Sequence, residues 1–307
     1  MSPFISVKKN SIVVVGGIGA QHNELSSIEV ISSDQTTRTK IEIPRFPKQI
    51  HKCHLFIQDG VLMAAGGFNW SGSFNESCYQ LKNGIWKINT KLKTKGYCTP
   101  DNLVITSKAI YTFGADKNSK IVRYLPTNSK NWIVEKNSKI PGQFMLGCAV
   151  EVKSKGEIWL IGGFGKRGKL ILSFDLQNHT FRKLPMKLIT GRSSHKCILT
   201  KIGDSEVILV TGGISEEVRG RQLKSVEIVN ITEGTVTLSS PMNTRRNTHG
   251  IGTLNINNQT RIVVFGGWNG SKDLSTIEVF DQETLKWEFV KDYEMAESRS
   301  DFGYLTM

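Results

Sequence analysis

A run of apolar residues that ends in two glycines recurs along this chain and restricts its fold more than any other feature. The clear copies end at Gly16-Gly17, Gly66-Gly67, Gly162-Gly163, Gly212-Gly213 and Gly266-Gly267, and a degenerate copy ends at Gly114-Ala115. The first glycines of successive copies lie 48 to 54 residues apart, so six units fill the 307 residues. Such self-similarity at a fixed period is the signature of a repeat architecture.

Each unit has the pattern of four β-strands. A short apolar stretch such as 249–254 comes first, and the run into the glycines follows. That run does not alternate between apolar and polar residues, which indicates a strand buried on both faces. An alternating strand such as 275–281 comes third. The fourth strand opens with a large residue in four units: Trp86, Trp132, Phe181 and Trp287.

Repeated four-stranded units of this length predict an all-β fold, a six-bladed β-propeller with four antiparallel strands per blade. One such domain accounts for residues 1–307. The glycine pairs are interpreted as structural, since residues without a Cβ allow close backbone approach and positive φ near the crowded axis. A phosphate-binding loop would need a helix after the glycines, and no helical pattern follows them.

The sixth unit carries a motif that resembles a kelch repeat. Its residues are Pro241-Met242, Arg246, His249-Gly250, Gly266-Gly267-Trp268-Asn269-Gly270, Glu278-Val279-Phe280-Asp281, Trp287 and Met295. All six units fit this pattern, although the third is weak because Ala115 replaces the second glycine. The chain is most similar to the propellers of kelch-like proteins, which carry BTB and BACK domains that this sequence does not contain.

The carboxyl terminus is expected to close the ring. Residues 300–307 follow the sixth unit, and Arg299 with Phe302-Gly303 repeats the spacing of Arg246 with His249-Gly250. We expect this segment to be the first strand of the blade whose other strands lie in residues 11–45, which removes two exposed sheet edges. Residues 3–7 stand at a similar distance before Gly16 and are the competing candidate.

The composition indicates the cellular compartment in which the protein is expected. No stretch of 18 apolar residues occurs, and the amino terminus lacks a secretory signal, so neither a membrane span nor secretion is expected. The five cysteines, Cys53, Cys78, Cys98, Cys148 and Cys197, are dispersed without CxxC spacing. This pattern predicts reduced thiols in a cytoplasmic or nuclear protein.

The formal net charge of +13 is expected to be concentrated on one face. In a four-stranded blade, the loops from strand two to three and from strand four to the next blade share a side of the ring. With approximate loop boundaries, these segments hold nearly all of the net charge. A basic face favours an acidic partner.

Candidate binding residues follow from this arrangement. Arg192, Arg246 and Arg299 precede the first strand of three blades, with Lys48 and Gln143 assigned to the same position in two others. They are predicted to ring the channel mouth, where guanidinium groups suit carboxylates. The alternative, which the kelch resemblance implies, is that these arginines bond to loop carbonyls. Cations further out and two tryptophan anchors complete the set: Lys166, Arg167, Lys169, Arg219, Arg221, Trp70 and Trp268.

No catalytic or metal site is predicted. The histidines are His22, His51, His54, His179, His195 and His249. His51, His195 and His249 are assigned to equivalent first-strand positions, which would hold them too far apart for one zinc ion. No nucleophile and base can be paired from spacing, so we expect neither a cofactor nor an enzyme. A kelch-type enzyme, such as an oxidase with a copper site, is the remote alternative.

The predicted function is protein binding by a monomeric propeller. The family resemblance implies a substrate receptor of a cullin-type ubiquitin ligase that holds an acidic segment of its substrate. Binding to the acidic surface of actin is the alternative. Nucleic acid suits the charge but lacks a continuous basic groove with stacking aromatics.

Overall fold

The apolar runs that end in glycine form the second strand of each antiparallel sheet. The computed structural model describes residues 10–32, 43–71, 75, 77–91, 102–114, 121–127, 129, 131–218 and 220–307. Within them, strands such as β1 (Ser11–Val15) and β9 (Ala109–Phe113) are buried along their whole length. A strand covered on both faces needs no polar alternation.

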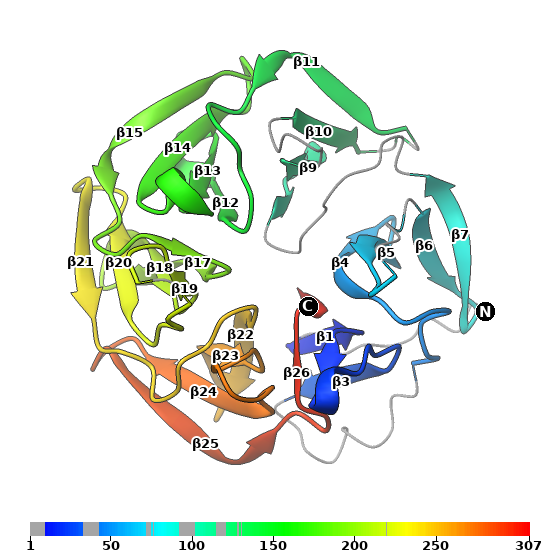
Figure 1. Ribbon diagram of the computed structural model, residues 1–307. Helices are drawn as coiled ribbons and strands as arrows, with labels where there is room; N and C mark the ends of the chain where they lie inside the picture. The colour runs from blue at the N-terminus through cyan, green and yellow to red at the C-terminus, as the bar shows by residue number, and fades with distance from the viewer. Residues whose placement is uncertain are drawn as a thin grey trace.

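Six sheets stand around a central axis as the blades of a propeller (Figure 1), which confirms the predicted fold. Blades two to six each show four strands in the order of the chain. Blade two contains β4 (His51–Gln58), β5 (Val61–Phe68), β6 (Ser77–Lys82) and β7 (Ile85–Lys91). Blade three contains β8 (Leu103–Ile105), β9, β10 (Ile121–Pro126) and β11 (Ile133–Lys139).

Blades four, five and six repeat this order. Blade four contains β12 (Cys148–Val152), β13 (Glu157–Ile161), β14 (Leu170–Asp175) and β15 (Phe181–Lys187). Blade five contains β17 (Lys196–Ile202), β18 (Ser205–Thr211), β20 (Val226–Asn230) and β21 (Thr235–Ser239). Blade six contains β22 (Gly250–Ile256), β23 (Gln259–Phe265), β24 (Thr276–Asp281) and β25 (Lys286–Glu294).

Blade one is closed by the carboxyl-terminal segment, as predicted. Strand β27 (Gly303–Thr306) pairs antiparallel with β1, and β1 pairs with β3 (Ile28–Ser32) on its other side. Next to it, β26 (Arg299–Ser300) pairs with β2 (Ile18–Gly19). The competing segment 3–7 and the expected outer strand of this blade lie outside the described residues.

The glycine pairs have a steric reason. Gly266 has φ +60°, and a Cβ there would lie 2.8 Å from the carbonyl oxygen of Arg299 in the next blade. Gly267 has φ +94°, and its Cβ would lie 2.7 Å from the carbonyl oxygen of Asn247. Side chains are excluded here by both conformation and space.

The hydrophobic core lies between neighbouring blades rather than at the axis. Leu209 and Val226 of blade five pack with Val264, Phe280 and Trp287 of blade six in one buried cluster. Each blade is therefore stabilised by the faces of its two neighbours.

A chain of backbone hydrogen bonds links the blades at one mouth of the channel. The N–H of Ser194 donates to the carbonyl of Leu146 (2.7 Å), Thr248 to Ser194 (2.9 Å), and Asp301 to Thr248 (3.1 Å). Lys52 then donates to Asp301 (2.6 Å). All five residues have positive φ, so the same turn recurs before the first strand of five blades.

The prediction that the cysteines are reduced is wrong for one pair. Cys148 on β12 and Cys197 on β17 form a disulfide between blades four and five, with their Cα atoms 6.1 Å apart. The two are 49 residues apart in sequence, so only the ring brings them together. Cys53 and Cys78 are free and buried, and Cys98 lies outside the described residues.

Two remaining secondary-structure features complete the described chain. Short strands β16 (Arg192–Ser193) and β19 (Ile214–Ser215) pair between blades four and five, and single 3-10 turns occur at Ala20–His22, Lys153–Lys155 and Gly165–Arg167. No helix of the described residues is long and apolar enough to cross a membrane.

Candidate protein-interaction face

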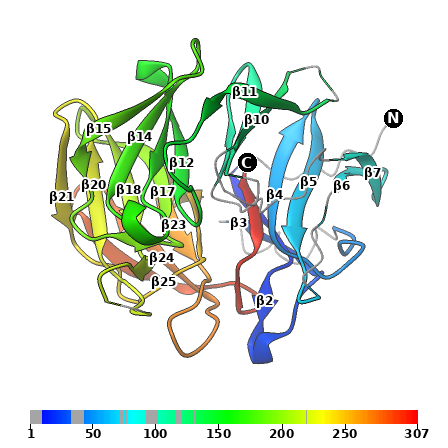
Figure 2. The same cartoon turned by 45° about the horizontal axis from the view of Figure 1, so that its top comes forward.

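The loops that follow the glycine pairs and the inter-blade loops lie on one side of the ring, called here the loop face. Figure 2 shows the segment around β2 and the orange loop between β23 and β24 projecting from this side. The site residues predicted from sequence belong to these loops, but the structure separates them into buried and exposed groups.

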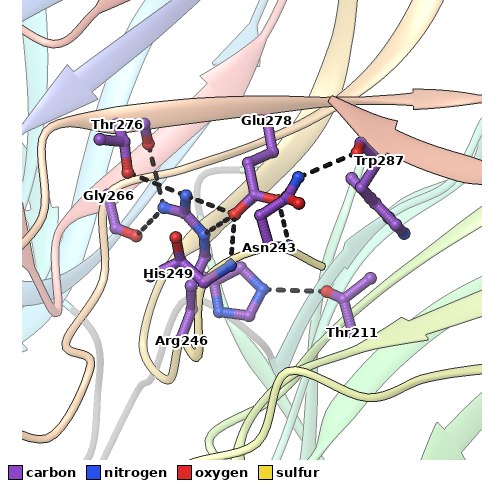
Figure 3. Close-up of polar contacts among 9 residues, drawn as sticks. Thr211, Asn243, Arg246, His249, Gly266, Thr276, Glu278 and Trp287 are labelled. Carbon is purple, nitrogen blue, oxygen red and sulfur yellow. Dashed lines mark hydrogen bonds and ion pairs between the residues drawn. The ribbon is translucent and has the colours of Figure 1, made fainter. Parts of the chain in front are cut away.

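Arg246 is buried and bonded entirely within the protein (Figure 3). Its Nη1 donates to the carbonyl oxygens of Gly266 (2.9 Å) and Thr276 (3.0 Å). Its Nη2 donates to Thr276 Oγ1 (2.9 Å) and to Glu278 Oε1 (2.9 Å). The carboxylate of Glu278 also accepts the backbone N–H groups of Asn243 (2.6 Å) and Thr244 (3.0 Å). Together the pair fastens the inter-blade loop to the third strand of blade six.

Arg192 makes the same set of contacts in blade five. It donates to the carbonyls of Gly212 (2.9 Å) and Ser225 (3.1 Å), and it pairs with Glu227 at 2.5 Å. Arg299 does so in blade one, where it donates to the Gly16 carbonyl (2.9 Å) and pairs with Glu297 (2.8 Å) and with Glu29 (3.6 Å). Burial lowers the pKa of each of these arginines, and the nearby glutamates oppose that shift.

These contacts correspond to the alternative interpretation of the three arginines. A guanidinium group that is at most 1% exposed and already bonded to loop carbonyls offers a partner no surface. The placement of Arg192, Arg246 and Arg299 therefore argues against a recognition ring, and they are removed from the candidate site. Their charge is largely balanced by the paired glutamates. Any electrostatic attraction of an acidic partner must therefore come from exposed cations elsewhere on the loop face.

Lys48 and Gln143 do not stand at the arginine position. The carbonyl of Ile50 accepts the N–H of Gly17 (2.9 Å), as that of Arg246 accepts the N–H of Gly213 (2.8 Å). Ile50 is thus the equivalent residue, two positions after Lys48. Lys48 is exposed and donates to Asn75 Oδ1 (2.8 Å).

In blade two, an asparagine makes the loop hydrogen bonds that the arginine makes in blades one, five and six. Asn75 Nδ2 donates to the carbonyls of Gly66 (2.9 Å) and Ser77 (3.0 Å), which correspond to Gly212 and Ser225 in blade five. In blade four the inter-blade hydrogen bonds place Phe144, not the neighbouring Gln143, at the arginine position.

Arg167 is also buried, unlike its neighbours in sequence. It is 5% exposed, donates from Nη1 to the carbonyl of Pro141 (2.9 Å), and lies over the ring of Phe144 at 5.1 Å. Burial lowers its pKa to about 10. It is therefore packed against the loop before blade four rather than turned toward a partner.

Of the three histidines assigned to equivalent first-strand positions, two are equivalent in the structure. His195 and His249 stand at matching positions before β17 and β22, but the matching residue in blade two is Cys53, which pairs with Gly66. Burial lowers the pKa of His195 to about 3, so this imidazole is neutral. Among the described residues, no three metal-binding side chains gather.

Apart from Lys48, the exposed predicted residues are on the loops after the glycine pairs. Lys166, Lys169 and Arg221 are exposed, and Arg219 lies outside the described residues. Trp70 is 62% exposed, and Trp268 is partly exposed. Two exposed apolar side chains on these loops were not among the predicted residues: Phe164 is 62% exposed, and Val218 is 51% exposed.

The loops of blades four and five are fastened to each other. The N–H of Gly165 donates to Glu216 Oε2 (2.9 Å), and the N–H of Glu216 donates to the carbonyl of Gly191 (2.8 Å). Lys169 pairs with Glu217 at 2.6 Å. Phe164 and Val218 are thus presented from one connected pair of loops.

Comparison with known proteins agrees with this architecture. Residues 257–292 match the family model of the Kelch motif, and they contain β23, β24 and most of β25. No curated protein matches the chain. The motif match and the six-bladed ring together support a kelch-repeat propeller, a class that typically serves as a protein-interaction module.

Proposed function

We propose that this propeller binds an acidic segment of a partner protein on the loop face over blades four to six. The observation that carries the proposal is a set of exposed cations beside exposed apolar side chains. Lys166, Arg221, Lys224 and Arg245 are exposed, and none of them pairs with a carboxylate among the described residues. Phe164 and Val218 lie on the same loops.

The chemistry of this surface favours acidic chains with an apolar residue. Unpaired surface cations attract carboxylates and raise the association rate, while apolar anchors contribute to retention after docking. Because the surface is exposed, its electrostatic part should weaken with salt.

A charge-reversal experiment tests the proposal. Lys166→Glu, Arg221→Glu and Arg245→Glu are combined in one protein, and partners are recovered by affinity purification. The matched control carries Lys155→Glu, Lys201→Glu and Lys286→Glu, which change three exposed lysines at the opposite ends of the blades by the same total charge. We expect the loop-face variant to lose its partners and the control to keep them. Equal recovery from both proteins would contradict the proposal.

The identity of the recovered partner separates the finer hypotheses. The kelch resemblance supports a substrate receptor of a cullin-type ubiquitin ligase, for which cullin components and a substrate would be recovered with the full-length protein. Actin binding, the alternative, predicts co-sedimentation with filaments that the loop-face variant loses.

A further inference from the structure

A group of aromatic rings lies on the loop face over blades six, one and two. The ring of His22 lies 5.6 Å from that of Trp268, and the ring of Trp70 lies 5.5 Å from that of His51. Trp70 and His22 are exposed. The first pair joins His22 of blade one to Trp268 of blade six, and the second lies within blade two. Figure 2 shows the blue segment around β2 beside the orange loop of Trp268.

Glu24 follows His22 by two residues in the chain and is bonded to both residues of the Trp70–His51 pair. Its Oε1 accepts the backbone N–H of Trp70 at 2.6 Å and is bonded to His51 Nδ1 at 2.8 Å. Its Oε2 accepts no hydrogen bond from the described residues. The side chain is only 8% exposed, so its direction is set by these two bonds.

The charge of Glu24 has no cationic partner among the described residues. Among the described residues His51 is its one ion-pair candidate, and burial lowers the pKa of that imidazole, which disfavours its charged form. Desolvated carboxylates are costly when unpaired. A carboxylate held in this way favours the binding of a cation from another molecule.

Charged groups of both signs lie on the loops around the rings. Asp273 is 8% exposed, its Oδ1 has no hydrogen-bond partner, and burial raises its pKa. Asp301 is paired with Lys52 at 3.5 Å. Lys272 is exposed on the loop of Trp268. Exposed cations also occur on this part of the loop face, at Arg45 and Lys48 of blade two, so the proposed preference for a cation rests on Glu24 itself.

We propose that Glu24, Trp70, His22 and Trp268 form a subsite for the cationic side chain of an arginine or lysine in the partner. The guanidinium or ammonium group would lie against the indole rings and donate a charge-assisted hydrogen bond to Glu24 Oε2. The inference deepens the proposed function and rests on it for the statement that the cation belongs to a partner. It gives the partner segment mixed charge, acidic over blades four to six and basic over blades six to two.

A short peptide tests the subsite without the partner. Acetyl-Gly-Arg-Gly amide is titrated into the 15N-labelled protein, and the indole N–H signals of its six tryptophans are followed by NMR. Trp70→Phe and Trp268→Phe assign the two relevant signals. We expect both to shift saturably, and Glu24→Gln to weaken binding about tenfold, because the amide keeps the shape of the acceptor but removes its charge.

Matched controls separate charge recognition from general attraction. Glu217→Gln removes an exposed carboxylate of the loop face over blade five, 48% exposed, and should leave the titration unchanged. The norleucine peptide, which has no charge, should shift the signals much less. A folded Trp70→Leu protein should bind the arginine peptide more weakly as well.

Several results would overturn the subsite: no shift with the arginine peptide, equal shifts with norleucine, or undiminished binding by folded Glu24→Gln. None of them bears on the charge-reversal experiment, which alters blades four to six. Failure of the subsite and failure of the proposed function are therefore distinguishable.

Discussion

Arg192, Arg246 and Arg299 show how a charged residue becomes part of a propeller's interior. Each guanidinium donates to the carbonyl of the first glycine in its own blade, and each pairs with a glutamate on the third strand: Glu227, Glu278 and Glu29. The glutamate is part of the alternating third strand. Because both charges are buried, removing one leaves the other without compensation.

This pairing predicts a large effect from a single substitution. Arg246→Met should lower the free energy of unfolding by about 3–5 kcal/mol, since Glu278 would remain buried as an unpaired charge. Urea denaturation measures the loss. The neighbouring Arg245 is exposed, so Arg245→Met should change stability by no more than about 0.5 kcal/mol.

The double variant Arg246→Met, Glu278→Leu completes the test. It should recover part of the loss, because no unpaired charge remains, although the carbonyls of Gly266 and Thr276 still lack their donor. A cost below about 1 kcal/mol for Arg246→Met would contradict this account.

At the scale of the strand, closure depends on the last residues of the chain. Strand β27 covers the inner edge of β1, and the N–H of Asn10 donates to the carbonyl of Met307 at 2.8 Å. Phe302 is 2% exposed and packs against Phe265 with ring centroids 5.6 Å apart. The segment therefore belongs to the core as well as to the sheet.

Deletion of residues 300–307 should be far more damaging than removal of an ordinary tail. We expect a loss of at least about 3–5 kcal/mol, the usual cost of deleting one buried phenylalanine, with further loss from the opened sheet edge. Thermal unfolding and amide exchange in β1 report the change. An unaltered melting temperature with protected β1 amides would show that the ring closes in another way.

The strands were predictable and the side-chain roles were not, for a physical reason. The strand order and the closure of the ring follow from the sequence pattern that every blade repeats. Register does not. The spacing from Lys48 to His51 matches that from Arg246 to His249, but in blade two it is Cys53, not His51, that pairs with the first glycine, Gly66, so Lys48 was misplaced by two residues. The direction of Arg192 depends on Glu227, 35 residues away. One signal was available, since arginine and glutamate occur together in blades one, five and six.

The sequence predicted that basic and aromatic residues would be exposed on this face, but not which individual side chains would be. Lys166, Arg221 and Trp70 lie on loops that the topology assigns to one face, and they are exposed there. Arg167, a neighbour of Lys166, is buried over Phe144 instead. Whether the side chain of a loop cation turns inward depends on its contacts with other segments. The sequence of the loop alone does not show these contacts.

At the scale of the whole molecule, neighbouring blades are joined by three kinds of link: packed faces, the backbone bonds at the channel mouth, and one disulfide. The disulfide Cys148–Cys197 lies near the Ser194–Leu146 hydrogen bond, which joins the same two blades. The connected loops that carry Phe164 and Val218 also belong to blades four and five. The covalent link is thus placed to stabilise the part of the ring that presents the proposed binding surface.

Loss of this link should weaken the ring by about 2–4 kcal/mol, the range expected for a crosslink that closes a loop of this length. Under reducing conditions the protein should gain two titratable thiols and unfold at a lower temperature. The variant Cys148→Ala, Cys197→Ala should be less stable than the oxidised protein and should no longer respond to reductant. The remaining buried pair serves as the internal control, because Cys53 and Cys78 are unpaired and burial raises the pKa of each thiol to about 12. A thiol count that does not rise on reduction would show that the two sulfurs are not bonded in solution, and the stability of blades four and five would then rest on packing and hydrogen bonds alone.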